Sequence, residues 1–174
     1  ACDHVGMDPK ITSSPRVIMA ADAVILPGVG AFGDAMRFLT KLNMVEPLRE
    51  VALSNKPLLA ICLGMQLLMA QSNEFGVHPG LGIIQGSVLK LGEPKADASI
   101  NSRDLKVPHI GWNQIYRQAE FDISQFSDRL NDDSWHGGLL DGLTYGDYMY
   151  FVHSFYAVPT DLQVISSISY FGNL

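Results

Sequence analysis

One apolar strand that runs directly into a helix constrains the fold of this chain more than any other feature. Lys56 to Cys62 (KPLLAIC) is apolar throughout after its proline, which suits a strand buried on both faces of a parallel sheet. The next stretch, Leu63 to Gln71 (LGMQLLMAQ), has the apolar pattern of a helix. Cys62 is therefore expected at a strand-to-helix corner.

The same alternation occurs once upstream. Ala21 to Leu26 (ADAVIL) predicts a short strand that ends on Pro27-Gly28. Helices are predicted from Asp34 to Leu42 and from Val45 to Ser54, where Pro47 is tolerable only in the first turn. Strand, helix, strand, helix is the order typical of an α/β sheet.

The second half of the chain has a different pattern, with predicted strands and little helix between them. These strands run from Leu81 to Leu91, from Val107 to Tyr116, from Tyr148 to Val158 and from Leu162 to Tyr170. Two stretches are predicted as loops, Gly92 to Asp104 and Glu120 to Asp141. We expect a mixed sheet with an antiparallel part, in a single domain over residues 1–174.

Composition and charge exclude several classes of protein. A length of 174 residues, 47% of them hydrophobic, suits one domain with its own core. The net charge is −6 and no block of Lys or Arg occurs, which argues against nucleic acid or an anionic membrane as a partner. No apolar run is long enough to span a membrane, and the first residues lack the pattern of a secretory signal.

The cysteines and histidines do not form a metal site in the sequence. Cys2 and Cys62 make neither a disulfide framework nor a ligand set. His109 follows a proline and has no Cys or His at ligand spacing, so we expect no metal and no cofactor. A reduced, cytoplasmic setting is the default for such a chain.

The corner at the cysteine has the form of a nucleophile elbow. Ala60-Ile61-Cys62-Leu63-Gly64 places small residues two positions either side of the cysteine, as a tight strand-to-helix turn requires. The helix N-terminus beside the sulfur favours the thiolate, which is the reactive form. A buried structural cysteine is the alternative, because Cys is among the most buried residue types. The spacing alone does not separate these two interpretations.

A glycine-rich segment upstream offers a competing interpretation. Gly28 to Gly33 (GVGAFG) matches the G-x-G-x-x-G pattern of a dinucleotide site, between a predicted strand and a predicted helix. Glu50 lies near the distance expected of the ribose-binding acid, but it falls inside a predicted helix, and Pro27 stands directly before the first glycine. The other interpretations are a turn that needs positive φ, and a loop whose backbone N–H groups face the cysteine.

A series of longer stretches resembles one known family. In chain order they are ADAVILPGVGAFGDAM (Ala21 to Met36), KPLLAICLGMQLL (Lys56 to Leu68), EFGVHPGLGIIQGSV (Glu74 to Val88), KVPHIGWNQI (Lys106 to Ile115) and YMYFVHSFYAVP (Tyr148 to Pro159). They look like the successive signature blocks of the glutaminase subunit of imidazole glycerol phosphate synthase, within the class I triad glutamine amidotransferases. The resemblance covers most of the chain. It implies a three-layer class I glutamine amidotransferase fold, α/β with a central mixed, mostly parallel sheet whose edges are incomplete here.

The resemblance assigns the chemistry to Cys62. It implies that this cysteine attacks the side-chain amide carbon of glutamine, forms a thioester and releases ammonia. The oxyanion would be held by the backbone N–H of Leu63 and by the loop at Val29. Donors of this kind are usually the largest single catalytic contribution.

The resemblance also implies a site for the amino-acid end of glutamine. Gln66, one turn beyond the cysteine, would contribute to it. The other expected substrate-binding residues are Gly28, Gly30, Ser154 and Phe155. From the residues alone, Gln66 would be a solvated side chain and His153 a satisfied core histidine, and no base role is assigned to His153.

A partner protein is the third implication of the resemblance. Trp112 and Asn113 would lie on the face that docks against the cyclase (synthase) barrel subunit in a heterodimer, whereas a core position is the alternative for Trp112. The ammonia would pass to this partner, which makes imidazole glycerol phosphate in histidine biosynthesis. Two alternatives stay open: a glutaminase that serves another acceptor synthetase, and a degenerate, non-catalytic glutaminase that acts as a docking module.

The chain departs from the family pattern at both ends. The family's catalytic His and Glu lie in a Phe-His-Pro-Glu type segment near the C-terminus, and no such segment occurs after Gly146. The histidine in that region, His153, already matches another block. The family's first strand and most of its first helix lack counterparts before Ala1. We therefore expect the 174 residues to be part of a longer glutaminase and to be inactive alone.

Overall fold

The chain contains two compact units, Ala1–Leu89 and Lys90–Leu174. The computed structural model describes residues 1–92, 106–117, 135 and 138–171. The loops predicted at residues 92–104 and 120–141 therefore lie almost entirely outside the described residues. The single domain over residues 1–174 stays a prediction. Within the described part, no helix is both long enough and apolar enough to cross a membrane.

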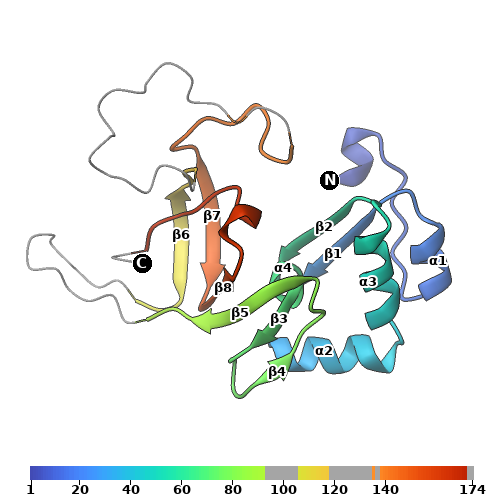
Figure 1. Cartoon of the computed structure of the whole chain (residues 1–174). Coiled ribbons are helices and arrows are strands. Elements are labelled where there is room, and N and C mark those ends of the chain that lie inside the picture. The colour runs from blue at the N-terminus through green and yellow to red at the C-terminus, as the bar shows by residue number, and fades with distance from the viewer. Residues whose placement is uncertain (93–105, 118–134, 136–137, 172–174) are drawn as a thin grey trace, which may run out of the picture. The chain divides into compact units, whose positions relative to one another are not determined.

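The first unit alternates strands and helices, as predicted (Figure 1). Its elements are η1 (Cys2–Val5), α1 (Pro15–Ala20), β1 (Val24–Gly28), α2 (Phe32–Lys41), α3 (Val45–Leu53), β2 (Leu58–Cys62), α4 (Leu63–Leu67), β3 (Met69–Ser72), β4 (His78–Pro79) and β5 (Ile84–Lys90). β1 and β2 are parallel, in a register that runs from Val24 opposite Leu58 to Gly28 opposite Cys62. β3 is parallel to β5 and antiparallel to β4. The unit thus has the mixed, mostly parallel pairing that was expected.

The short helix α4 is the element around which the first unit packs. It contacts β1, β2, β3 and α2, while α1 packs against α3 and α2 also contacts β4. The buried apolar side chains of the unit are Ile18, Val24, Phe32, Met44, Leu48, Val51, Leu63, Leu67, Met69, Leu81 and Val88. Most of them lie on α1, β1, α2, α3, α4, β3 and β5, and Leu63 and Leu67 of α4 connect the cysteine corner to this core.

β1 and α4 approach each other backbone to backbone. A Cβ atom built on Gly64, in the first turn of α4, would lie 1.9 Å from the carbonyl oxygen of Leu26. From the other side, a Cβ atom on Gly28 would lie 2.8 Å from the backbone nitrogen of Gly64. Neither position has room for a side chain, so both need glycine for the close approach itself.

The strand at the corner is less covered than its sequence predicted. Leu58, Leu59 and Ala60 are half-buried, whereas Ile61 is 47% exposed and Cys62 is exposed as well. Burial on both faces was therefore a wrong expectation for the end of this strand. The reason is that, among the described residues, β2 pairs with β1 alone.

The helix predicted from Leu63 to Gln71 ends early, at Leu67, and the strand β3 follows it. The carbonyl groups that would continue the helix accept backbone N–H groups from the segment around the start of β5 instead. These bonds are Leu81 N to Leu67 O at 2.8 Å, Ile84 N to Leu68 O at 2.9 Å and Gly82 N to Met69 O at 3.1 Å. The apolar spacing correctly predicted burial of Met69, but tertiary hydrogen bonds overrode the helical period.

The second unit is built on an antiparallel pair of strands (Figure 1). Its elements are β6 (His109–Gln114), β7 (Tyr148–His153), β8 (Phe155–Pro159) and the 3-10 helix η4 (Leu162–Val164). β6 and β7 pair from His109 opposite His153 to Gln114 opposite Tyr148. This confirms the antiparallel part of the expected sheet.

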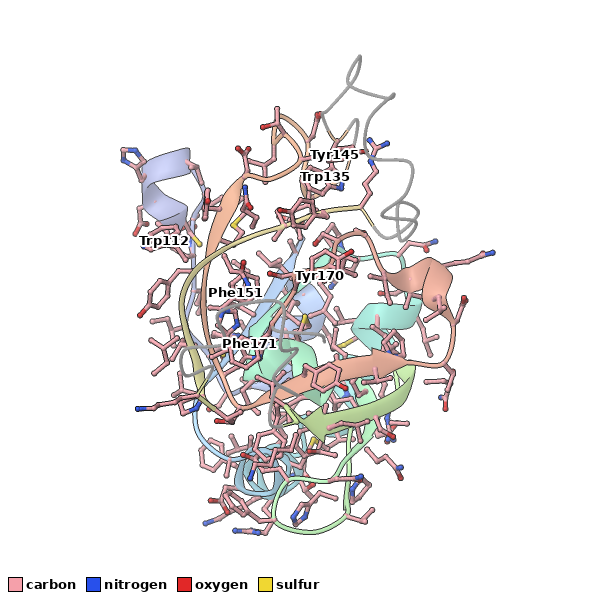
Figure 2. All side chains as sticks on the ribbon, turned by 90° about the vertical axis from the view of Figure 1, so that its left-hand side faces the viewer. Trp112, Trp135, Tyr145, Phe151, Tyr170 and Phe171 are labelled. Carbon is pink, nitrogen blue, oxygen red and sulfur yellow. The ribbon has the colours of Figure 1, made fainter. Side chains whose placement is uncertain are left out.

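Trp135 is a buried anchor of the second unit. Its ring meets Tyr145 edge-on, with centroids 5.0 Å apart, and its Nε1 donates to Ser166 O at 3.4 Å. Figure 2 shows both rings together, at the end of the ladder where β7 begins. A buried indole with its N–H satisfied is the favourable way to place tryptophan in a core.

Two strand predictions in this unit need correction. The stretch from Tyr148 to Val158 is two strands, because the chain bends at Ser154. The stretch from Leu162 to Tyr170 begins with η4 instead of a strand. There the Asp161 carboxylate accepts the N–H of Gln163 at 2.9 Å and so starts a helical turn.

Replacing Gly64 by alanine should strongly destabilise the first unit, because the new methyl group would overlap Leu26 O. We expect Gly64→Ala to lower the free energy of unfolding by about 3 kcal/mol or more, the upper end of overpacking costs. Chemical denaturation of the chain measures this. Met65→Ala, on the exposed side of the same helix, is the control and should cost no more than about 1 kcal/mol. Equal losses in the two variants would contradict the close backbone contact.

Candidate active site

Cys62 adopts the backbone conformation of a nucleophile elbow. β2 ends at Cys62 and α4 begins at Leu63, with no residue between them. Cys62 has φ of 56° and ψ of −120°, a region that residues with a side chain rarely enter. Such a conformation costs about 1–3 kcal/mol and persists only where the surrounding structure enforces it. In α/β hydrolases the same kind of turn presents the nucleophile at the end of a strand.

The thiol of Cys62 is accessible from outside the unit. Cys62 is exposed, so the alternative of a buried structural cysteine was wrong. The helix that follows it is shorter than predicted, with 5 residues. The helix field at the sulfur therefore comes from fewer aligned peptide groups than the sequence suggested.

The glycine-rich loop lies directly beside this corner. Its first residue, Gly28, is opposite Cys62 in the β1–β2 register. At its far end, the N–H of Phe32, where α2 begins, donates to Glu74 Oε2 at 2.6 Å. The intervening residues 29–31 are thus held at both ends, next to the cysteine.

Conformation and context favour one interpretation of this loop over the others. Val29 is 92% exposed, and Gly30 has φ of 94°, which glycine adopts most readily. Glu50 lies inside α3, not at the end of a strand as a ribose-binding acid would. A loop beside the cysteine therefore fits better than a dinucleotide site. The oxyanion roles of Val29 and Leu63 stay predictions.

Glu74 is a residue of this site that sequence reasoning missed. Its carboxylate satisfies a backbone donor 42 residues away, at the start of α2, where an acid is also favoured by the helix dipole. No local sequence pattern predicts a contact over this separation. The available signal was its isolation, since no other Asp, Glu, Lys or Arg occurs between Lys56 and Lys90.

The first unit brings most of the predicted site residues together. Cys62 and Leu63 form the corner, the loop with Gly28, Val29 and Gly30 lies beside it, and Gln66 is half-buried further along α4. The remaining predicted residues belong to the second unit and are Ser154, Phe155, Trp112 and Asn113. Their assigned roles, like that of Gln66, stay predictions.

Trp112 and Asn113 present their side chains to opposite faces of β6. Trp112 is 69% exposed, so the alternative that places it in the core was wrong. Asn113 Nδ2 donates to the carbonyl oxygen of Tyr170 at 2.5 Å, which ties β6 to the chain beyond η4. Docking by these two residues stays a prediction.

His153 is held by hydrogen bonds at both ring nitrogens. Its Nδ1 lies 3.0 Å from Phe155 O, and its Nε2 lies 3.1 Å from Nδ1 of His109. This agrees with the interpretation of a satisfied core histidine. Burial of His109, and then electrostatic repulsion from His153, lower the pKa of His109 from its ordinary value of 6.5.

Fold and site together define an α/β protein with a cysteine nucleophile elbow. Among the described residues, no group of three His, Cys, Asp or Glu side chains could hold a metal ion. The sequence matches the family described as glutamine amidotransferase class-I over residues 5–170. The chain belongs to the class I glutamine amidotransferase family, as the resemblance predicted.

Curated relatives within this family carry the name imidazole glycerol phosphate synthase subunit HisH. The protein of that name from Syntrophotalea carbinolica is 41% identical, over 98% of this chain and 73% of its own length. The one from Aquifex aeolicus is 40% identical, over 99% and 71%. HisH 1 from Legionella pneumophila strain Lens is 41% identical, over 87% of this chain and 64% of its own, so the chain spans about two thirds of the length of these relatives.

A solved structure is also similar, at a low level. It is a crystal structure of a glutamine amidotransferase with 16% identity and a TM-score of 0.46, over 65% of this chain and 54% of that chain. At that level the likeness adds nothing to the family assignment.

The geometry predicts that Cys62 is the reactive thiol and Cys2 is not. A diazo-ketone analogue of glutamine should label Cys62, because that thiol is exposed at the elbow, whereas Cys2 is half-buried in η1. Peptide mapping by mass spectrometry locates the label. Free glutamine should slow the labelling of Cys62. Equal labelling of both cysteines would contradict the assignment of Cys62 as the reactive thiol.

Proposed function

We propose that this chain hydrolyses the side-chain amide of glutamine, giving glutamate and ammonia. The observation that carries the proposal is the strained elbow at Cys62, with the glycine-rich loop in register beside it, in a chain of this family. The names of the relatives support it further, since each is a subunit of imidazole glycerol phosphate synthase.

The proposed reaction begins with attack by Cys62 Sγ on the amide carbon. The S–C bond forms while the carbonyl π electrons move to oxygen, and the resulting oxyanion needs preorganised N–H donors. We assign these donors to Leu63, directly after the nucleophile, and to Val29. When the tetrahedral intermediate collapses, the C–N bond breaks and the nitrogen takes up a proton to leave as ammonia. Water then cleaves the thioester, which gives glutamate and restores the thiol.

Both proton transfers need a general base, which typically contributes about 10²–10⁴ in rate. In the family a His–Glu pair supplies it. Neither residue of that pair is assigned here, and His153 is not proposed for the role because both of its ring nitrogens are engaged within the second unit. For the amino-acid end of glutamine we propose Gln66 and the backbone of Gly28, Gly30, Ser154 and Phe155.

We further propose that the ammonia passes to a partner, the cyclase subunit of imidazole glycerol phosphate synthase, in the cytoplasm. The docking surface would be the outward face of the β6–β7 ladder. Its members alternate along the two strands and are all exposed: Ile110, Trp112, Tyr148, Tyr150 and Val152. Trp112 and Tyr150 are directly opposite in the ladder, with ring centroids 5.7 Å apart.

Contiguous exposed apolar surfaces often serve as interaction sites, which supports this assignment. Figure 2 shows Trp112 on the opposite side of the ladder from Phe151 and Phe171, the two rings that pack against His109. Trp is the residue type most often found at the energetic centre of an interface. The names of the relatives support a partner subunit, since each describes one subunit of a synthase, and the cyclase is the partner that the resemblance implies.

Turnover of glutamine tests the proposed activity. With the product of the complete reading frame and its synthase partner, Cys62→Ala should lower the release of glutamate and ammonia by at least about 10³-fold, because triad members act as a unit. Cys2→Ala is the matched control and should leave the rate unchanged. Persistence of turnover in Cys62→Ala would show that another group is the nucleophile.

Binding to the cyclase subunit tests the docking surface. Trp112→Ala should weaken the complex by about 2 kcal/mol or more, as truncation of a central interface tryptophan does. Calorimetric titration measures this. The control is Phe38→Ala, which removes an exposed aromatic side chain from α2, away from the proposed surface. If both variants bind as tightly as the parent while remaining folded, the surface is wrongly assigned.

A further inference from the structure

A hairpin of the first unit holds the first turn of α2. The hairpin consists of β3, β4 and residues 73–77 between them, and β4 contacts α2. Figure 1 shows the hairpin beside the start of this helix. Two of its side chains, Glu74 and His78, reach the first turn of α2.

Glu74 makes the polar contact. Its carboxylate accepts the N–H of Phe32 at 2.6 Å, a short distance of the kind that carboxylate acceptors give. The N-cap residue of α2, Ala31, has no side-chain acceptor of its own. The N–H groups of a first helical turn need acceptors from outside the helix, and Glu74 supplies one here.

His78 makes the packing contact. A Cβ atom built on Gly33 would lie 2.8 Å from Cε1 of the His78 ring, and Gly33 is buried. The absence of a side chain on Gly33 therefore lets the ring lie directly against the helix backbone. Together with the hydrogen bond at Phe32, this contact fixes the first turn of α2 against the hairpin.

Glu74 is itself held by the strand that precedes it. Its N–H donates to Ser72 Oγ at 3.2 Å, and Ser72 is fully buried. The N–H of Asn73 donates to Val88 O at 3.0 Å, which continues the pairing of β3 with β5. The carboxylate is therefore carried by backbone that the core of the unit fixes.

The segment 29–31 joins the cysteine corner to the first turn of α2. It includes Val29, whose backbone N–H we assigned to the oxyanion. The side chain of Val29 is 92% exposed, and Gly30 has φ of 94°, so the segment gains little rigidity from its own residues. Its conformation is set from its two ends, which are Gly28 in the β1–β2 register and Phe32 at the carboxylate.

We propose that Glu74 is a positioning residue for catalysis. By holding the N–H of Phe32, its carboxylate keeps the segment 29–31 in the conformation that directs the Val29 N–H toward the oxyanion. This role rests on the proposed function, because it extends the oxyanion role assigned there to Val29. It gives a purpose to a carboxylate that has no step in the proposed reaction.

Two substitutions separate the hydrogen bond from the negative charge. Glu74→Gln keeps an acceptor oxygen at the same reach without the charge, whereas Glu74→Asp keeps the charge but is one methylene group shorter. We expect Glu74→Asp to lower kcat for glutamine about tenfold to a hundredfold, up to the cost of losing one oxyanion donor, and Glu74→Gln to retain most of the rate. KM should change by less than about threefold in both, because the affected interaction is made in the transition state.

The matched control is Asp34→Asn. Asp34 is an exposed carboxylate in the same turn of α2, and it pairs with Arg37 of its own helix. This variant should turn over glutamine at the rate of the parent. All rates are measured on the product of the complete reading frame with its synthase partner, and thermal unfolding of each variant is the folding control.

Hydrogen exchange at Phe32 tests the bond without turnover. An N–H in the first turn of a helix has no partner within the helix and ordinarily exchanges fast. We expect the Phe32 N–H to be protected in the parent and in Asp34→Asn, and to lose protection in Glu74→Asp. Fast exchange of this N–H in the parent would overturn the positioning role even if the variants do not fold.

The kinetic outcomes separate this role from others. A loss of kcat in Glu74→Gln as large as in Glu74→Asp, or an unchanged kcat in Glu74→Asp, would overturn the positioning role in folded proteins. A rise in KM with kcat preserved would also overturn it, because the carboxylate would then contact the substrate itself. Each of these results leaves the proposed function intact, whereas a parent that does not turn over glutamine would contradict the proposed function.

Discussion

The rest of the site depends on the close contact between the backbone of α4 and the backbone of β1. Gly64 lies so near Leu26 O that no side chain fits between them, which allows the helix to begin immediately after the strand. Cys62 then takes up the turn in a single residue, at φ of 56°. The same packing puts Gly28 opposite the cysteine, so one contact sets both the nucleophile and the loop beside it.

Much of this corner could be predicted from the sequence, because its signals are local. An apolar run, a cysteine and small residues at fixed spacing predict the turn, whereas the register that puts Gly28 opposite Cys62 was not predicted. The missed features depend on contacts between distant residues. Glu74 reaches a backbone donor 42 residues away, and the bond between His109 and His153 spans 44. The helix predicted after Leu63 was too long for the same reason, since the carbonyls of Leu67 to Met69 accept N–H groups from residues near the start of β5.

A common physical device occurs in each unit at the positions assigned to function. In each case a group from another part of the chain holds the backbone at or beside the position: the contact of Gly64 with Leu26 beside Cys62, the Glu74 carboxylate at the N–H of Phe32, and the His153 ring at the carbonyl of Phe155. Fixed backbone donors suit a reaction that develops an oxyanion and binds an amino-acid end, because they need no reorganisation when charge appears. The exposed ladder around Trp112, which we propose as the docking surface, differs because its side chains, not fixed backbone donors, would make the contacts.

Trapping of the covalent intermediate tests the central claim, that Cys62 is the nucleophile of an amide hydrolysis, most directly. Carbon-labelled glutamine is mixed with the product of the complete reading frame and its partner, the reaction is quenched in acid, and the peptides are mapped. We predict a γ-glutamyl thioester on the peptide that contains Cys62, released by hydroxylamine. Consumption of glutamine with no label on that peptide, or with label on another residue, would contradict the account.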